Sequence, residues 1–483
     1  MFVVKRLLCV FSAMILFLLV PAVALGSAQD NQSEPIVLTC WVYYNGMQEQ
    51  GFDQLLQEFN DGMGAEKNIF IESHSVGSVV DLANKVMDSA NNEVGADAMP
   101  DMFASYADTA YTLKQMGVVA DLSPYMTADE ISAYVDAYME EGRMGEDHAI
   151  SIFPVAKSSE LLLLNRTVWN AFAEATGADE GKLATWEGIA ELGHAYFDWT
   201  DAQTPEADGD GRAFFGRDAM ANYLLIGSRQ LGAELFEVND GKAKLHFDKA
   251  VMEKLWRNFY IPYVSGWYGS YGRFRSDDIK TGQIIALVGS TSGAMYFPTE
   301  VTNDDGTTQP IECSVLYLPN FEGMQPMAAQ QGAGFVVAKS TPEREAAAVT
   351  FLKWFTEPER NIRFSLSSGY LPVTKEANDI AMMRTEMDQA GTNPMIRTIL
   401  ETSASIVNSY ELYTNKPYQN GDATRKILET DLLDAAKQGL EKRIHLQSTG
   451  MSYQDAVAQC TSNEYLELWL SQTQTALESA LAQ

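Results

Sequence analysis

The chain has 483 residues, of which 46% are hydrophobic and 20% are charged, and its formal net charge at pH 7 is −31. A chain of this length is too long to fold around a single compact core, so we expect two lobes. The negative charge repels phosphate groups and the basic residues are scattered along the chain. These features exclude nucleic acid and anionic membrane surfaces as expected partners.

The N-terminus follows the order of an export signal. Lys5 and Arg6 precede an apolar run over residues 7–20, which small residues follow. Residues 1–28 are therefore expected to be a signal peptide that sends the chain to the periplasm or the cell surface. A retained membrane anchor is the alternative, because the apolar run approaches spanning length. Cys9 lies inside this run, which makes it a poor lipid-attachment site.

Strand-like and helix-like patterns alternate after this leader. Apolar β-rich runs occupy residues 36–42, 68–73 and 102–104, and helical spacing of apolar residues occupies 51–60 and 79–90 between them. This order predicts a parallel sheet with crossover helices. Ligands of such sheets bind beyond the carboxyl ends of the strands.

Polar and aromatic residues gather at those strand ends. The stretches are Tyr43, Tyr44 and Asn45 after the first strand, Ser105, Tyr106 and Asp108 after the third, and Lys157, Ser158 and Ser159 beside a run of four leucines. Any one aromatic is more often part of a core than of a ligand site. Their shared position at strand ends favours a binding function.

The cysteines give no metal or cofactor site. Cys40, Cys313 and Cys460 are widely separated and odd in number, and no CxxC pair occurs. One disulfide is left open, although buried free thiols are the expected state of Cys40 and Cys313 in their apolar runs.

One acidic loop resembles the start of a calcium site. Glu206, Asp208 and Asp210 are spaced as in an EF-hand loop, but the twelfth position is Arg217 instead of glutamate. We therefore expect a solvated turn here, and no metal or cofactor anywhere in the chain.

Several stretches together resemble the family 1 extracellular solute-binding proteins of ABC importers, the maltodextrin-binding-protein-like class. These stretches are residues 99–126, 153–169, 286–293, 315–323 with 330–356, and 367–377. The resemblance spans nearly all of the mature chain. Each stretch is moderately specific alone, and their common order makes the resemblance strong.

The resemblance implies a two-lobed α/β fold of the periplasmic-binding-protein type. Each lobe is expected to hold a mainly parallel sheet flanked by helices, and segments that cross between the lobes are expected to act as hinges. The expected hinges are residues 154–158, 312–316 and 393–403. The expected lobes are residues 35–155 plus 314–392, and residues 156–313 plus 393–483.

The resemblance also implies ligand contacts in both lobes. Ser105, Asp108 and Ser158 match contact positions of the family, and Asn222 aligns near an aromatic contact with Tyr223 beside it. The complete set of candidate ligand-binding residues is Tyr43, Tyr44, Asn45, Ser105, Tyr106, Asp108, Lys157, Ser158, Ser159, Asn222, Tyr223, Trp267, Tyr268, Ser290, Thr291, Ser292, Gln331, Gly332 and Tyr370.

The loop after one predicted strand departs from the family pattern. Thr291 and Ser292 align where maltodextrin binders carry a tryptophan, so a maltodextrin is not the expected ligand. Trp267 and Tyr268 could provide a stacking surface for a sugar ring from a different place. Arg273 and Arg275 leave an acidic sugar or a glycerol-phosphate-type ligand open.

The expected function is to bind a solute, most readily a mono- or oligosaccharide, and to deliver it as a monomer to the permease of an ABC transporter. An exported carbohydrate-active enzyme and a ligand-sensing receptor partner are the alternatives. No HExxH motif occurs, and threonine stands at position 291 where a GxSxG nucleophile motif needs serine. We therefore expect no catalysis.

Overall fold

The structure is a computed structural model. It describes residues 34–145, 147–239, 241–302 and 306–482. The signal peptide expected over residues 1–28 lies outside the described residues. The residues from Ile36 to Gln483 form one compact unit, and residues 34–35 precede its first strand.

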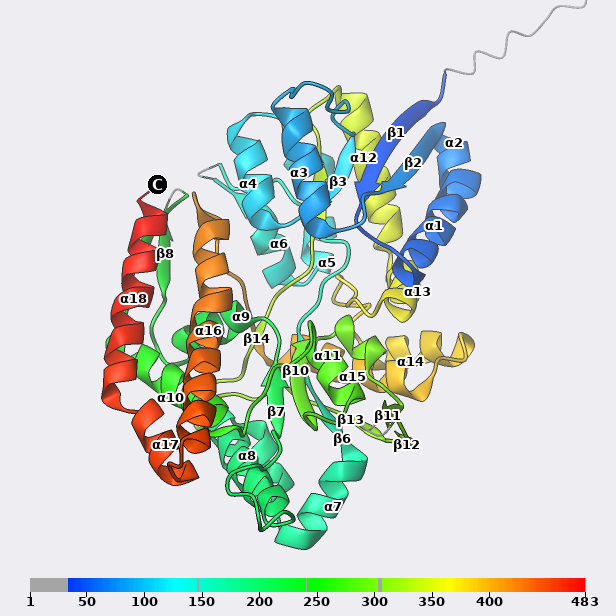
Figure 1. The fold of residues 1–483 in the computed structure, drawn as a ribbon. Helices are drawn as coiled ribbons and strands as arrows, with labels where there is room; N and C mark the ends of the chain where they lie inside the picture. Colours follow the sequence, from blue (N-terminus) through cyan, green and yellow to red (C-terminus); the bar gives the residue numbers. More distant parts are fainter. Residues whose placement is uncertain (1–33, 146, 240, 303–305, 483) are drawn as a thin grey trace, which may run out of the picture. The chain divides into compact units, whose positions relative to one another are not determined.

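The first of two four-stranded sheets has the strand order β15, β3, β1, β2. Figure 1 labels three of these strands, β3, β1 and β2, next to one another. Its strands are β1 (Ile36–Val42), β2 (Ile69–Ser75), β3 (Met102–Ser105) and β15 (Gly334–Val337). β1 is parallel to β2 and β3, whereas β15 is antiparallel to β3. The parallel pairing predicted for the strands near the N-terminus is confirmed, and β15 joins them from a distant part of the chain.

Helices cover this sheet and enclose a first hydrophobic core. They are α1 (Met47–Phe59), α3 (Val79–Ala90), α4 (Ala107–Gln115), α5 (Ala128–Ala133), α6 (Asp136–Gly142), α12 (Pro342–Phe355) and α13 (Pro358–Ser368). The first core contains Leu38, Phe103, Phe153 and Phe335, all fully buried. α3 begins at Ser78, whose hydroxyl accepts a hydrogen bond from the N–H of Asp81, as an N-cap does.

The second sheet has the strand order β13, β6, β10, β7. Its strands are β6 (Glu160–Asn165), β7 (Phe215–Arg217), β10 (Ala286–Ser290) and β13 (Cys313–Leu316). The four leucines of β6 are at most 2% exposed, so the expected buried central strand is confirmed. The expected mainly parallel pairing is wrong for this sheet, because β6 enters from the first core and runs antiparallel to both β10 and β13. Only β7 and β10 form a parallel pair within it.

A second hydrophobic core surrounds this sheet and the helices that follow. The helices are α7 (Arg166–Thr176), α8 (Trp186–Asp201), α9 (Met220–Gln230), α10 (Lys249–Ser265), α11 (Arg275–Lys280), α15 (Pro394–Ser409), α16 (Gly421–Ser448), α17 (Tyr453–Cys460) and α18 (Asn463–Leu481). The second core contains Leu163, Phe215, Leu287 and Leu432. α16 packs against both α9 and α10, and Glu429 in its third turn accepts hydrogen bonds from the N–H groups of Met220 and Ala221 at the start of α9.

Short strand pairs and a small helical cluster complete the described chain. The remaining elements are α2 (Ala65–Lys67), α14 (Ile380–Gln389), β4 (Arg143–Met144) with β5 (Ala149–Ile150), β8 (Phe236–Asn239) with β9 (Lys242–Leu245), β11 (Glu300–Thr302) with β12 (Thr308–Pro310), and β14 (Met327–Ala329) with β16 (Glu411–Tyr413). α14 and α15 share a third, smaller core with α13. None of the helices within the described ranges is long and apolar enough to cross a membrane.

The chain crosses between the two main cores at segments that pair with each other. The first core reaches Ala156 and the second begins at Leu161, and the chain returns between Ala328 and Ala333. The backbone of Ser158 exchanges two hydrogen bonds of 2.9 Å with that of Gln331, which joins the two segments. The crossing expected at residues 312–316 is wrong, because these residues include β13 and belong to the second sheet. Residues 393–403, the third expected hinge, lie mainly in α15.

Candidate functional site

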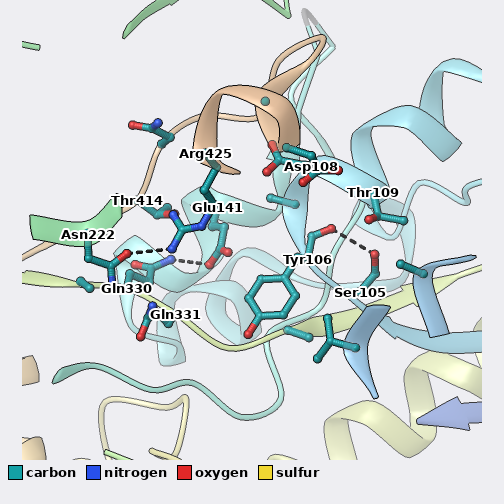
Figure 2. Close-up of a pocket in the computed structure, with 18 of the residues that line it drawn as sticks. Ser105, Tyr106, Asp108, Thr109, Glu141, Asn222, Gln330, Gln331, Thr414 and Arg425 are labelled. Atoms are coloured by element: carbon teal, nitrogen blue, oxygen red, sulfur yellow. Dashed lines mark hydrogen bonds between the residues drawn. The ribbon is translucent and has the colours of Figure 1, made fainter. Parts of the chain in front are cut away.

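A hollow of about 660 Å³ lies between elements of the first and second cores (Figure 2). The ends of β1 and β3 and the start of α4 form one side of it, and α9 with the start of α16 forms the other. Its polar and aromatic lining residues include Tyr43, Ser105, Tyr106, Asp108, Thr109, Glu141, Asn222, Gln330, Gln331, Thr414, Tyr418, Asp422, Arg425 and Lys426.

The side that belongs to the first core is built at the carboxyl ends of two strands. β3 ends at Ser105, whose hydroxyl donates a hydrogen bond of 3.0 Å to the carbonyl oxygen of Tyr106 (Figure 2). Tyr106 is 39% exposed and immediately precedes α4, so it lines the hollow at a helix start. Tyr43, beyond β1, shares a hydrogen bond of 3.2 Å with the hydroxyl of Tyr370. An exposed aromatic ring beside polar groups therefore marks this side.

The opposite side is organised by a buried carboxylate on β6. Glu160 accepts hydrogen bonds from Nη2 of Arg217 at 3.0 Å and from Nδ2 of Asn222 at 3.1 Å. Arg425 then donates from Nη2 to Oδ1 of Asn222 at 2.9 Å (Figure 2). Burial raises the pKa of Glu160, whereas the charge of Arg217 acts in the opposite direction. The chain of contacts fixes the guanidinium of Arg425 at the wall of the hollow.

A buried ion pair lies where the crossing segments meet the hollow. Nζ of Lys157 contacts Oε2 of Glu141, and the two side chains are 2% and 8% exposed. Lys157 also donates to the carbonyl oxygen of Gly332 at 2.7 Å, and Gln330 donates to the same carboxylate of Glu141. These bonds connect both crossing segments to α6 of the first core.

Asp108 lines the hollow with a carboxyl group whose pKa is strongly raised. Burial raises its pKa to about 7 from an ordinary value of 3.8, the charge of Asp422 adds to the rise, and Arg425 opposes it. The carboxyl group therefore changes charge near neutral pH. It can donate or accept a hydrogen bond to a bound molecule within a narrow pH range.

The acidic loop that resembles a calcium site is engaged with protein groups. Asp208 accepts a hydrogen bond from the N–H of Tyr453 at 3.1 Å, and Asp210 accepts one from the hydroxyl of Thr204 at 2.6 Å. Among the residues with described positions, no group of three or more His, Cys, Asp or Glu side chains is arranged to hold a metal ion. Cys40, Cys313 and Cys460 are free thiols.

A sequence profile of bacterial extracellular solute-binding proteins matches residues 54–391. The chain belongs to this family. A search of curated protein sequences found no match.

Solved structures of other solute-binding proteins share the fold. The cyclic α-maltosyl-1,6-maltose binding protein of Arthrobacter globiformis has a TM-score of 0.66 at 19% identity, covering 92% of this chain and 99% of its own. UgpB of Mycobacterium tuberculosis, solved with glycerophosphocholine, has a TM-score of 0.60 at 18% identity, covering 91% and 99%. Lmo0181 of Listeria monocytogenes, solved with cycloalternan, has a TM-score of 0.59 at 15% identity, covering 91% and 99%. The two-lobed fold of the family is thereby shown for this solute-binding protein.

The structure brings six of the expected ligand-binding residues of this solute-binding protein to the hollow. They are Tyr43, Ser105, Tyr106, Asp108, Asn222 and Gln331. They come from both sides and from a crossing segment, as the strand-end argument expects. Their contact with a solute stays a prediction.

Expected residues next to these six support the hollow from behind. Tyr44 is buried with its ring centroid 5.4 Å from that of Phe52, and Tyr370 supports Tyr43 as described. Asn45 turns away and donates to the carbonyl oxygen of Gly77 at 3.0 Å. These residues fix the shape of the first side without lining it.

The crossing residues and the loop after β10 bind mainly to one another. Lys157, Ser158 and Gly332 take part in the paired crossing segments. The N–H of Ser159 donates to the hydroxyl of Thr291 at 3.3 Å, and the N–H of Thr291 donates to the carbonyl oxygen of Ser159 at 2.9 Å. The hydroxyls of Ser290 and Ser292 lie 3.0 Å apart and bond to each other. None of these residues lines the hollow.

The aromatic residues expected as a stacking surface lie elsewhere. Trp267 stacks on His194 with ring centroids 4.3 Å apart, and Tyr268 is buried with its ring 4.9 Å from that of Phe215. Tyr223 is buried and donates to the carbonyl oxygen of Leu255 at 2.9 Å. All three lie in or against the second core and none lines the hollow, because their apolar rings pack against the sheet and helices.

Sequence reasoning missed the residues of α16 and α6. Arg425, Asp422 and Lys426 lie at least 200 positions after Asn222 in the chain, and no motif marks them. Glu141 is one of many acidic residues, so composition could not single it out. The aromatic and polar stretch around Tyr413 and Tyr418 is the one signal that could have directed attention to this region.

Proposed function

We propose that this solute-binding protein binds a carbohydrate in the hollow and delivers it, unchanged, to the permease of an ABC importer. The observation that carries the proposal is the lining of the hollow. Tyr106, which is 39% exposed, lines the hollow together with the carboxyl, amide and guanidinium groups of Asp108, Asn222 and Arg425. Sugars offer apolar C–H faces to aromatic rings and hydroxyl groups to such polar side chains.

The size of the hollow suits a small polar solute. Its volume of about 660 Å³ is within the range of about 300 to 1,000 Å³ that is usual for small-molecule sites. Related solved structures bear on the solute class too, since those from Arthrobacter globiformis and Listeria monocytogenes are named for cyclic maltosyl-maltose and cycloalternan. These names support a carbohydrate without identifying which one.

Trapping is proposed to occur by closure of two lobes about the paired crossing segments. We place the hinge at residues 157–158 and 330–331, where the cores are joined by backbone hydrogen bonds. We also propose that the protein is exported, acts as a monomer and performs no chemistry on the solute. The family to which it belongs is extracellular, which supports the proposed location.

A phosphodiester solute is the second candidate, because of Arg425. The guanidinium lines the hollow and donates to the neutral amide of Asn222, and no ion pair of Arg425 occurs among the residues that the structure describes. A guanidinium in this state suits phosphate oxygens. The glycerophosphocholine in the Mycobacterium tuberculosis structure is an example of this solute class.

A thermal-shift screen distinguishes the two candidates. One arm contains neutral mono- and oligosaccharides, including maltotriose and cycloalternan, and the other contains glycerophosphocholine and other polyol phosphodiesters. A solute at a hundredfold excess over its Kd stabilises the folded state by about 2.7 kcal/mol. A shift only in the first arm supports the carbohydrate, a shift only in the second supports the phosphodiester, and conversion of a solute into a product contradicts the absence of chemistry.

A further inference from the structure

Helix α4 of the first core contacts a hairpin of the second core with no room for a side chain between them. Tyr111 of α4 packs against the first core, and the strands β8 and β9 pack against the second. Gly241 is in the turn between β8 and β9. A Cβ atom at Gly241 would lie 1.5 Å from Oη of Tyr111 and 2.3 Å from its Cζ. The ring of Tyr111 therefore sits directly on the backbone of the hairpin.

A second glycine meets the same helix one turn earlier. Gly421 is the first residue of α16, and a Cβ atom there would lie 2.9 Å from Oδ1 of Asp108 and 3.3 Å from its Cγ. The N–H of Gln419 donates to the carbonyl oxygen of Gly241 at 2.9 Å, so the hairpin turn and the start of α16 are one connected surface. Two residues of α4 thus rest on two glycines of this surface.

The two glycines differ in what their backbones require. Gly241 has a φ of +66°, a left-handed conformation that itself favours glycine. Gly421 is not among the residues of positive φ, so its backbone conformation does not by itself favour glycine. The close contact with Asp108 explains why position 421 has a residue without a side chain.

The residues of the α4 contact line two neighbouring hollows. Asp108 and Gly421 line the hollow described above, whereas Tyr111 and Gly241 line a second hollow of about 440 Å³. The two hollows share Glu141 and other lining residues. The α4 contact is therefore at the border of both, where the first and second lobes touch.

We propose that Tyr111 and Asp108 of α4 with Gly241 and Gly421 form a latch, which holds the lobes together over the bound solute. The latch rests on the proposed function for its role in trapping a solute. It makes Gly241 and Gly421 positioning residues for closure, because a side chain at either position would force Tyr111 or Asp108 out of the place that it has in this contact.

Small-angle scattering on the full mature chain tests the latch. The variants are Gly241→Ala and Gly421→Ala. The control for the first is Gly177→Ala, with a φ of +73° and no atom within 4 Å of an added Cβ. The control for the second is Gly293→Ala, the first residue of a short 3₁₀ helix, where the nearest atom is 4.0 Å away. The radius of gyration is measured with no solute, with maltotriose, and with glycerophosphocholine.

Each variant is compared with its control in whichever of the three conditions gives the wild type its smallest radius of gyration. The test therefore does not depend on one particular solute. The latch predicts that each test variant has a larger radius of gyration than its control, with a circular-dichroism spectrum like that of the control. Equal radii for Gly421→Ala and Gly293→Ala overturn the latch, and so do equal radii for Gly241→Ala and Gly177→Ala. If Gly241→Ala does not fold, Gly241→Ala/Tyr111→Ala, which removes the clashing ring, must restore folding.

The outcome also separates the latch from the carbohydrate proposal. Failure of maltotriose to shift the melting temperature bears on the solute, whereas the difference in radius of gyration between each latch variant and its control bears on the latch. If a probe binds the wild type, each latch variant should bind it about tenfold more weakly, because overpacking of a closed contact typically costs 1 to 3 kcal/mol. Unchanged affinity together with unchanged radii contradicts the latch.

Discussion

Arg425 of α16 donates a hydrogen bond of 2.9 Å to the side-chain oxygen of Asn222 of α9, which in turn donates to the buried carboxylate of Glu160. The amide of Asn222 is therefore oriented by a group on each side. The two hydrogen bonds connect strand β6, through Asn222, to the charged side chain of Arg425 in the hollow. Removing Asn222 breaks both bonds at once.

Asn222→Ala should weaken solute binding. Arg425 loses the acceptor that orients it and Glu160 loses a donor, and a buried group left without its partner typically costs about 1 to 3 kcal/mol. We expect Kd to rise about tenfold or more in calorimetry with the solute that the screen identifies. Asn258→Ala is the matched control, because its amide bonds only to Lys254 within α10. Equal affinity of the two variants would contradict a role for the Asn222 network.

Asp108→Asn should change how stability depends on pH. The pKa of Asp108 is raised to about 7 in the folded state by burial and by Asp422, and is partly lowered again by Arg425, while Glu141 also raises it. A raised pKa means that the folded state binds the proton more tightly than the unfolded state. The resulting stability is complete below pH 4 and is lost as the pH rises through 7.

The difference in melting temperature between wild type and Asp108→Asn should therefore move with pH. We expect the wild type to lose stability relative to the variant between about pH 4 and pH 7, because in this range the unfolded state ionises while the folded state keeps its proton. Differential scanning calorimetry of both proteins across this range measures the difference. A constant difference would show that Asp108 does not titrate in this range.

Breaking the buried ion pair of the crossing segment should destabilise the fold. Lys157→Met leaves the carboxylate of Glu141 buried with no cation, and removal of one member of a buried pair typically costs about 3 to 5 kcal/mol. Lys182→Met is the control, because its pair with Glu191 is 47% and 62% exposed, and solvent screening leaves such an exposed pair little effect on stability. Urea unfolding of both variants measures the free energies, and equal losses would contradict this prediction.

The first sheet was largely predictable from the sequence, and the second was only partly so. The continuous apolar run at residues 36–42 and its helical neighbours follow a regular alternation, so parallel pairing was a sound inference. The leucines of β6 indicated a buried strand but carried no information about its direction. Its antiparallel pairing with β10 and β13 depends on where the chain crosses between cores, which local pattern does not encode.

The candidate site was predictable where it lies at strand ends and not where it lies on helices. Tyr43, Ser105 and Tyr106 follow strands directly, and the structure places them at the hollow. Arg425 reaches it only because α16 packs against α9, a tertiary contact without a sequence signature. Trp267 shows the converse case, since an aromatic-rich stretch that looks suited to sugars is packed against His194 and does not line the hollow.

Trp267→Ala tests whether the side chain of Trp267 contacts the solute. The truncation removes the stacking on His194 and should lower stability, typically by about 3 to 5 kcal/mol for a large aromatic in a core and by less at this partly buried site. Solute affinity should stay within twofold of the wild type, because Trp267 does not line the hollow. A large loss of affinity in calorimetry of a folded Trp267→Ala variant would show instead that Trp267 belongs to the binding site.

Calorimetric titration of the wild type and of Tyr106→Ala with the carbohydrate that gives the largest thermal shift tests the central claim most directly. The account predicts one bound solute per chain, recovered unchanged, and a Kd about tenfold or more higher for Tyr106→Ala, since the exposed ring supplies the apolar contact. The same Kd for a folded Tyr106→Ala variant, or no carbohydrate bound by the wild type, would contradict it.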